Sequence, residues 1–75
     1  MKAKAITWTA WNESVIPVTR TSRSMRQAVA EARDLVQNRF CGWGWIEYAY
    51  ADDPDKTIRS EELTRERGRW MRLCC

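Results

Sequence analysis

The sequence predicts a small α+β domain, in which an antiparallel sheet of three to five strands carries one amphipathic helix on one face, in a β-β-α-β-β-like order. Apolar residues alternate near the N-terminus and again after residue 42, which is typical of strands, and one stretch between them has helical spacing. The length of 75 residues allows a single domain, spanning 1–75. Because a core of this size is marginal, a partner or a second copy would help to stabilise it.

Two strands are predicted at the N-terminus. The segment "KAITWTAW" alternates apolar and polar residues, "WNES" follows as a tight turn, and "SVIPVTRT" is rich in β-branched residues. Because proline cannot donate to a ladder, Pro17 indicates that the second strand lies at a sheet edge or carries a bulge. The side chains expected to face the helix are Ile6, Trp8, Ala10, Ile16 and Val18.

The segment "SMRQAVAEARDLVQNRFCG" predicts the helix. Ser24 is a suitable N-cap, with Gln27 three residues later and Ser22 as the alternative cap, and Gly42 is suited to end the helix. The apolar stripe comprises Met25, Ala28, Val29, Ala32, Leu35, Val36 and Phe40. The opposite face is expected to be a mildly cationic, solvated ridge of Arg23, Arg26 and Arg33 with Gln37.

The segment "WGWIEYAYAD" predicts a third strand. Burying an unpaired carboxylate costs several kcal/mol, so we expect the face with Glu47 to be open and the face with Ile46, Tyr48 and Tyr50 to form the core. Trp43 and Trp45 then lie on the open side. The alternative is the reverse assignment, in which the large rings cap an edge of the core.

The C-terminal third is less determined. The segment "ADDPDK" has the residues of a turn, and Asp52, Asp53 and Asp55 lack the glycine and the distant glutamate of a calcium loop. Residues 57–68 fit either a helix, because "SEELTRERG" has acids first and arginines last, or a hairpin that turns near Gly68. The chain is predicted to end in a strand, "RWMRLC".

The composition argues against an enzyme. The sequence has no histidine, no C-x-x-C pair, no glycine-rich phosphate loop and no G-x-S-x-G motif. Cys41 is expected at the C-terminal end of the helix, where the dipole disfavours a thiolate. Glu61 and Glu62 face different ways on a helix or a strand. We therefore expect no catalytic residue, no cofactor and no metal.

The sequence contains no apolar run long enough to span a membrane and no secretory signal pattern. Its three cysteines, Cys41, Cys74 and Cys75, are an odd number, which does not fit a disulfide framework. We expect a cytoplasmic protein with reduced thiols and no membrane contact.

A binding surface is the functional prediction. Ten of the thirteen basic residues are arginines, and a single helix can cover only one face of a sheet, which leaves tryptophans on the other face or at its rim. Tryptophan and arginine are enriched among residues that dominate interface energies. The candidate anchors are Trp11, Trp43, Trp45 and Trp70, and the candidate charged contacts are Arg26, Arg33, Arg65, Arg67, Arg69 and Arg72.

Three functions would use such a face. The first is an inhibitor or adaptor that docks on a host protein or a ribonucleoprotein complex. The second is a module that binds single-stranded nucleic acid, because bases stack on sheet aromatics while arginines hold phosphates. The third is a structural homodimer that buries the open face against itself.

The size, the layout of hairpin, helix and antiparallel strands, and the ending "RGRWMRLCC" resemble small phage-encoded inhibitors of the anti-CRISPR type. The resemblance is one of architecture and identifies no contact residue. It implies a protein that occludes a surface of the host's RNA-guided complex without catalysis. The chain has a net charge of +3, which sets it apart from acidic inhibitors that mimic DNA and implies contacts with acidic protein patches, guide RNA or target phosphates.

Overall fold

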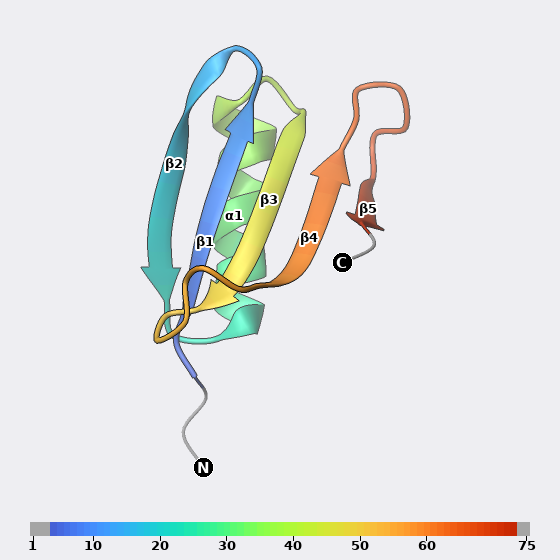
Figure 1. The fold of residues 1–75 in the computed structure, drawn as a ribbon. Helices are drawn as coiled ribbons and strands as arrows, with labels where there is room; N and C mark the ends of the chain where they lie inside the picture. The colour runs from blue at the N-terminus through green and yellow to red at the C-terminus, as the bar shows by residue number, and fades with distance from the viewer. Residues whose placement is uncertain (1–3, 74–75) are drawn as a thin grey trace.

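The computed structural model describes residues 4–73 and contains one helix and five strands (Figure 1). All neighbouring strands are antiparallel and their order is β2-β1-β3-β4-β5. The predicted fold class and order are therefore confirmed. In chain order the elements are β1 (Ile6–Asn12), β2 (Val15–Ser22), α1 (Met25–Arg39), β3 (Gly44–Tyr50), β4 (Thr57–Leu63) and β5 (Trp70–Leu73).

A β-bulge shifts the alternation of β2. Ala10 pairs with Val18 and Asn12 with Val15, so two β2 residues lie opposite Trp11 alone. As a result Val15 and Val18 both pack against the core, whereas Ile16 is 86% exposed. The expectation that Ile16 faces the helix is wrong, because a bulge moves the following side chains to the other face. Both readings of Pro17 are correct, since β2 is an edge strand and carries the bulge.

The helix begins and ends close to its predicted limits. Ser24 is the N-cap, and its hydroxyl accepts a hydrogen bond from the backbone N–H of Gln27 at 3.2 Å. After the last turn Cys41 and Gly42 both have positive φ, and the N–H of Gly42 donates to the carbonyl of Val36. The whole predicted apolar stripe packs in or against the core. In Figure 1, α1 lies behind β1 and β3 and leaves the near face of the sheet uncovered.

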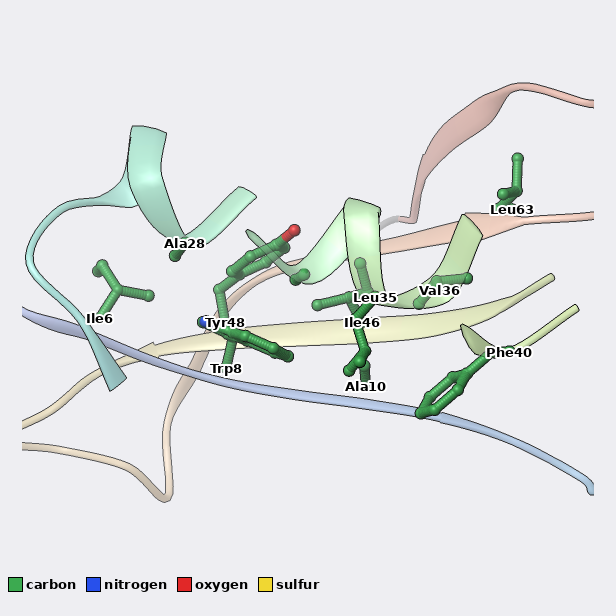
Figure 2. Close-up of a cluster of buried hydrophobic side chains, with 11 residues drawn as sticks. Ile6, Trp8, Ala10, Ala28, Leu35, Val36, Phe40, Ile46, Tyr48 and Leu63 are labelled. Carbon is green, nitrogen blue, oxygen red and sulfur yellow. The ribbon is translucent and has the colours of Figure 1, made fainter. Parts of the chain in front are cut away.

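The core lies between α1 and the strands β2, β1 and β3 (Figure 2). Ile46 and Tyr48 are fully buried, which confirms the face assigned to β3. Tyr50, expected beside them, is 38% exposed because it ends the strand, and the ring lies 4.7 Å from Nζ of Lys4. The buried apolar cluster comprises Ile6, Trp8, Ala10, Ala28, Ala32, Leu35, Val36, Phe40, Ile46, Tyr48 and Leu63.

Residues 57–73 form a hairpin rather than a helix. β4 and β5 pair from Leu63 opposite Trp70 to Ser60 opposite Leu73, and Gly68 has a φ of 65° in the connection. Figure 1 shows this hairpin extending to one side of α1. The backbone of the helix approaches β1, β2 and β3 within the described residues, but not β4 or β5. Side chains must therefore bridge the helix to β4.

Within residues 4–73, no helix has the length and apolar composition that crossing a bilayer would require. Cys41 is a free, exposed cysteine. Cys74 and Cys75, for which reduced thiols were also expected, lie outside the described residues.

Candidate functional site

Three tryptophans gather on the sheet face that α1 leaves open. The rings of Trp11 and Trp45 are stacked, with centroids 6.1 Å apart, and Trp43 meets Trp45 edge-on with centroids 5.7 Å apart. Trp11 and Trp45 are direct cross-strand partners on β1 and β3. All three rings are partly buried, because they shield one another. We call Trp11, Trp43 and Trp45 the tryptophan cluster.

Two residues fix the backbone on which this cluster stands. The buried side chain of Asn12 donates from Nδ2 to the carbonyls of Phe40 and Trp43, both at 3.2 Å, and so ties β1 to the start of β3. Gly44 has a φ of 152°, and a Cβ at this position would lie 2.6 Å from the carbonyl oxygen of Trp11. Only glycine allows the two strands to approach this closely. The ring contacts are therefore set by backbone that cannot shift easily.

An open groove of about 560 Å³ lies beside Trp43 and Trp45. The two rings give it an apolar wall. Its other sides come from the β1–β2 turn and from the end of β4 with the residues that follow, namely Glu13, Ser14, Glu62, Thr64, Arg65 and Glu66. The guanidinium of Arg65 lies over the ring of Trp43, 5.4 Å from its centroid. Aromatic faces, one cation and three carboxylates thus meet in one depression.

The three groove carboxylates lack cationic partners. Among the residues that the structure describes, the ion pairs are those of Glu61 alone, so Glu13, Glu62 and Glu66 have none. Arg65 contacts the ring of Trp43 and does not pair with a carboxylate. The groove therefore has an excess of negative charge although the chain as a whole is positive.

On the open face, the part formed by β1 and β2 is uncharged. Thr7 and Thr21 lie opposite each other and share a hydroxyl hydrogen bond at 3.1 Å, and Thr9 and Thr19 do the same at 3.0 Å. The paired hydroxyls satisfy one another. Glu47, exposed on this face beside Thr9, accepts a hydrogen bond from the hydroxyl of Thr57 at 3.1 Å, whereas the three groove carboxylates gather at the end of the sheet that holds the tryptophans.

The ten predicted contact residues do not form one surface. Arg65 is the single predicted arginine whose guanidinium lies over a ring of the cluster. Arg67, exposed in the β4–β5 connection, contacts the sulfur of Met71 at 2.8 Å, and Arg69 is also exposed there. Arg72 lies on β5 opposite Glu61, on the helix side. Arg26 is exposed on α1.

Trp70 and Arg33 lie on the helix side of the sheet. Trp70 is opposite the buried Leu63, packs partly against the core, and has the guanidinium of Arg33 5.3 Å from its ring centroid. The strand register thus separates Trp70 from the other three tryptophans. Arg33, expected on a solvated ridge, instead points from α1 toward β4.

The partner of Arg33 is Glu61, which is 1% exposed. Nε and Nη2 of Arg33 donate to the two carboxylate oxygens at 3.0 and 2.7 Å, and the hydroxyl of Tyr48 donates at 2.5 Å. Nη2 of Arg59 adds a contact at 3.3 Å. This buried network supplies the bridge between the helix and β4 that backbone packing does not provide. Three donors surround the Glu61 carboxylate, so the network links α1, β3 and β4.

The electrostatics of this network follow from its enclosure. Burial alone would raise the pKa of Glu61, but hydrogen bonds from Arg33 and Tyr48 outweigh burial and hold that pKa below its ordinary value. The pKa of Tyr48 is raised, first by burial and then by its hydrogen bond to Glu61. The hydrogen bond to Glu61 raises the pKa of Arg33. Glu61 is therefore ionised, and Tyr48 is neutral, over the whole neutral range.

The sequence contained a signal for this network. In β4, alternation places Arg59 and Glu61 on the same face as the apolar Leu63, so a helix-facing carboxylate needed a cation. Arg33 follows Val29 by four residues and precedes Val36 by three, which puts it at the border of the apolar stripe. These spacings alone indicate a solvated face, because they do not identify a partner 28 residues away.

In the described part of the chain, no group of three or more His, Cys, Asp or Glu side chains is placed to hold a metal ion. Comparison with protein-family models, curated proteins and solved structures finds no match for this chain.

Proposed function

We propose that this protein acts by binding, without catalysis, and that it uses the tryptophan cluster to occlude a surface of a host protein or ribonucleoprotein complex. The observation that carries this proposal is the placement of three ring-contacting tryptophans on the sheet face opposite the helix. Large rings held by a rigid strand pair offer contact area at low entropic cost, as interface anchors do. The architectural resemblance to anti-CRISPR inhibitors suggests the biological form of this binding.

The charges around the cluster favour a protein surface over a nucleic acid. Phosphates are attracted by Lys and Arg, yet Glu13, Glu62 and Glu66 line the groove beside Trp43 and Trp45. Open-face rings would suit stacked bases, but the adjacent carboxylates would repel their backbone. Direct binding of single-stranded nucleic acid therefore ranks second.

A plasmid challenge tests the inhibitor form. Bacterial strains with active RNA-guided immunity would express the protein and be transformed with a targeted plasmid. We expect the wild-type chain to raise transformation toward that of an untargeted plasmid, and the double substitution Trp11→Thr, Trp45→Thr to abolish the effect. Threonine is chosen because it favours strands and already occupies this face. The matched control is Arg26→Ala, on exposed helix surface.

No protection by the wild-type chain in any of the strains would refute the inhibitor form. Equal protection by the double variant, with its expression and melting temperature checked, would show that the open face is not the docking surface. A fluorescence titration with a mixed-sequence single-stranded oligonucleotide, at about 50 and about 200 mM salt, tests the second function. We expect no change, whereas quenching that weakens steeply with salt would promote nucleic acid to the first place.

A further inference from the structure

We infer that the groove beside Trp43 and Trp45 receives an arginine side chain from a basic segment of the partner protein. The inference rests on the proposed function and names the chemistry of the partner. It starts from the two kinds of group that line the groove, which are aromatic faces and carboxylates that have no cationic partner in the described part of the chain. A guanidinium satisfies both, because its plane stacks on rings while its edges donate to carboxylates.

The chain already places one guanidinium on this wall. Arg65, in the β4–β5 connection, lies over the ring of Trp43. Its side chain is exposed and forms no ion pair among the described residues. This contact shows that the ring is accessible to a guanidinium from the open side. Arg65 therefore acts as an internal occupant that an incoming arginine would displace or join.

The carboxylates are placed so that the groove attracts a cationic ligand and repels an acidic one. Glu62 lies on β4 directly opposite Trp45, on the open face, while Glu13 comes from the β1–β2 turn and Glu66 from the β4–β5 connection. They approach the groove from two separate segments, the β1–β2 turn and residues 62–66. A cation in the groove would meet negative charge from more than one side, and an acidic ligand would meet repulsion.

The volume and shape suit a side chain with its neighbouring backbone. At about 560 Å³ the groove lies within the range of small-ligand sites, roughly 300 to 1,000 Å³, but it is open along the sheet. Ile16, 86% exposed on the bulge opposite Trp11, is a further apolar side chain near the same end of the sheet, although it does not line the groove. A basic residue flanked by apolar ones is the segment that this surface fits.

The test uses short capped peptides in which glycine alternates with arginine, with lysine or with glutamate. NMR spectra of the labelled protein would follow the indole N–H signals of its tryptophans. We expect the arginine peptide to shift the signals of Trp43 and Trp45, the lysine peptide to bind more weakly, and the glutamate peptide not to bind. The double substitution Glu62→Gln, Glu66→Gln should weaken arginine binding, whereas Asp55→Asn, in the β3–β4 turn, should not.

Two matched arginine substitutions distinguish the effect of uncovering the Trp43 ring from the effect of net charge on peptide binding. Arg65→Ala frees the ring of Trp43 and should tighten binding of the arginine peptide about two- to fivefold, the range of one exposed cation–π contact. Arg67→Ala removes the same charge from the same connection without uncovering that ring, and should change affinity by less than about twofold. Equal tightening by both variants would overturn the internal-occupant argument.

The outcomes also separate this inference from the proposed function. If the arginine peptide shifts neither indole signal, the groove is not an arginine site. The proposed function would still stand if Trp11→Thr, Trp45→Thr abolished protection in the plasmid challenge. If the peptide binds but that double variant protects fully, the groove recognises arginine and the docking proposal fails.

Discussion

Arg33 on α1 and Glu61 on β4 form a two-point ion pair across the helix–sheet boundary, with the Glu61 carboxylate 1% exposed and the Arg33 side chain 35% exposed. The helix backbone does not approach β4 within the described residues, so side chains join the C-terminal hairpin to the helix: this pair, and the packing of Leu63, Ile58 and Trp70 in or against the core. The hairpin carries one wall of the groove. A buried ion pair therefore supports a surface on the opposite face of the sheet.

Removing Arg33 should destabilise the protein strongly. Arg33→Ala leaves the buried Glu61 with the hydrogen bond from Tyr48 and, as its cationic partner, only the longer contact to Arg59. We expect a loss of about 3 kcal/mol, at the lower end for breaking a buried pair. A domain of this size has a free energy of unfolding of about 3 to 5 kcal/mol, so much of it would be lost. Urea denaturation followed by circular dichroism measures this. Arg26→Ala on the same helix is the control, and a comparable loss there would contradict the assignment.

Acid should weaken the fold through Glu61. Because its pKa is lowered in the folded state, its stabilising contribution is present above the ordinary value of 4.5 and disappears as the pH falls through the folded pKa. Urea midpoints for wild type and Glu61→Gln, measured from about pH 7 to about pH 3, test this. The difference between the two proteins should shrink toward acid pH. A constant difference would show that protonation of Glu61 does not drive the acid transition.

Gly44 should be far less replaceable than Gly42. At Gly44 a Cβ would lie 2.6 Å from the carbonyl oxygen of Trp11, whereas at Gly42 nothing lies within 4 Å and only the positive φ of 77° opposes a side chain. We expect Gly42→Ala to cost about 1 to 2 kcal/mol and Gly44→Ala more than that, because β1 and β3 must also separate. Thermal melting distinguishes them. Equal losses would mean that the sheet accommodates the Cβ.

Two tryptophan-to-phenylalanine changes should have opposite consequences. Nε1 of Trp8 donates to Ser22 at 3.0 Å, so Trp8→Phe should lose about 1 to 2 kcal/mol through that hydrogen bond and the smaller ring. Nε1 of Trp70 is buried and has no hydrogen-bond partner among residues 4–73, so Trp70→Phe should be neutral or stabilising while it keeps an aromatic face for Arg33. Chemical denaturation compares the two. A large loss for Trp70→Phe would show that its indole N–H is satisfied in solution.

Much of this fold could be predicted because its signals are local. The alternation of Ile6, Trp8 and Ala10 and the helical spacing of α1 depend on neighbours within a few residues, and the structure confirms both. Ile16 was placed wrongly because a bulge depends on how β2 pairs with β1 rather than on the composition of β2. For the candidate site, the sequence correctly places Trp11, Trp43 and Trp45 on the open side of the sheet. Of the arginines expected beside them, only Arg65 lies there.

The sequence by itself determined the secondary structure before residue 57 and which faces of β1 and β3 form the core, because periodicity and turn chemistry act over short distances. Tertiary structure alone decided that residues 57–73 pair as a hairpin, that Trp70 lies on the helix side, and that Arg33 meets Glu61. Each depends on strand register or on a partner far along the chain. Tertiary structure also decided the charge of the groove beside the tryptophans. Its lining comes from three separate segments, which bring carboxylates rather than arginines to it.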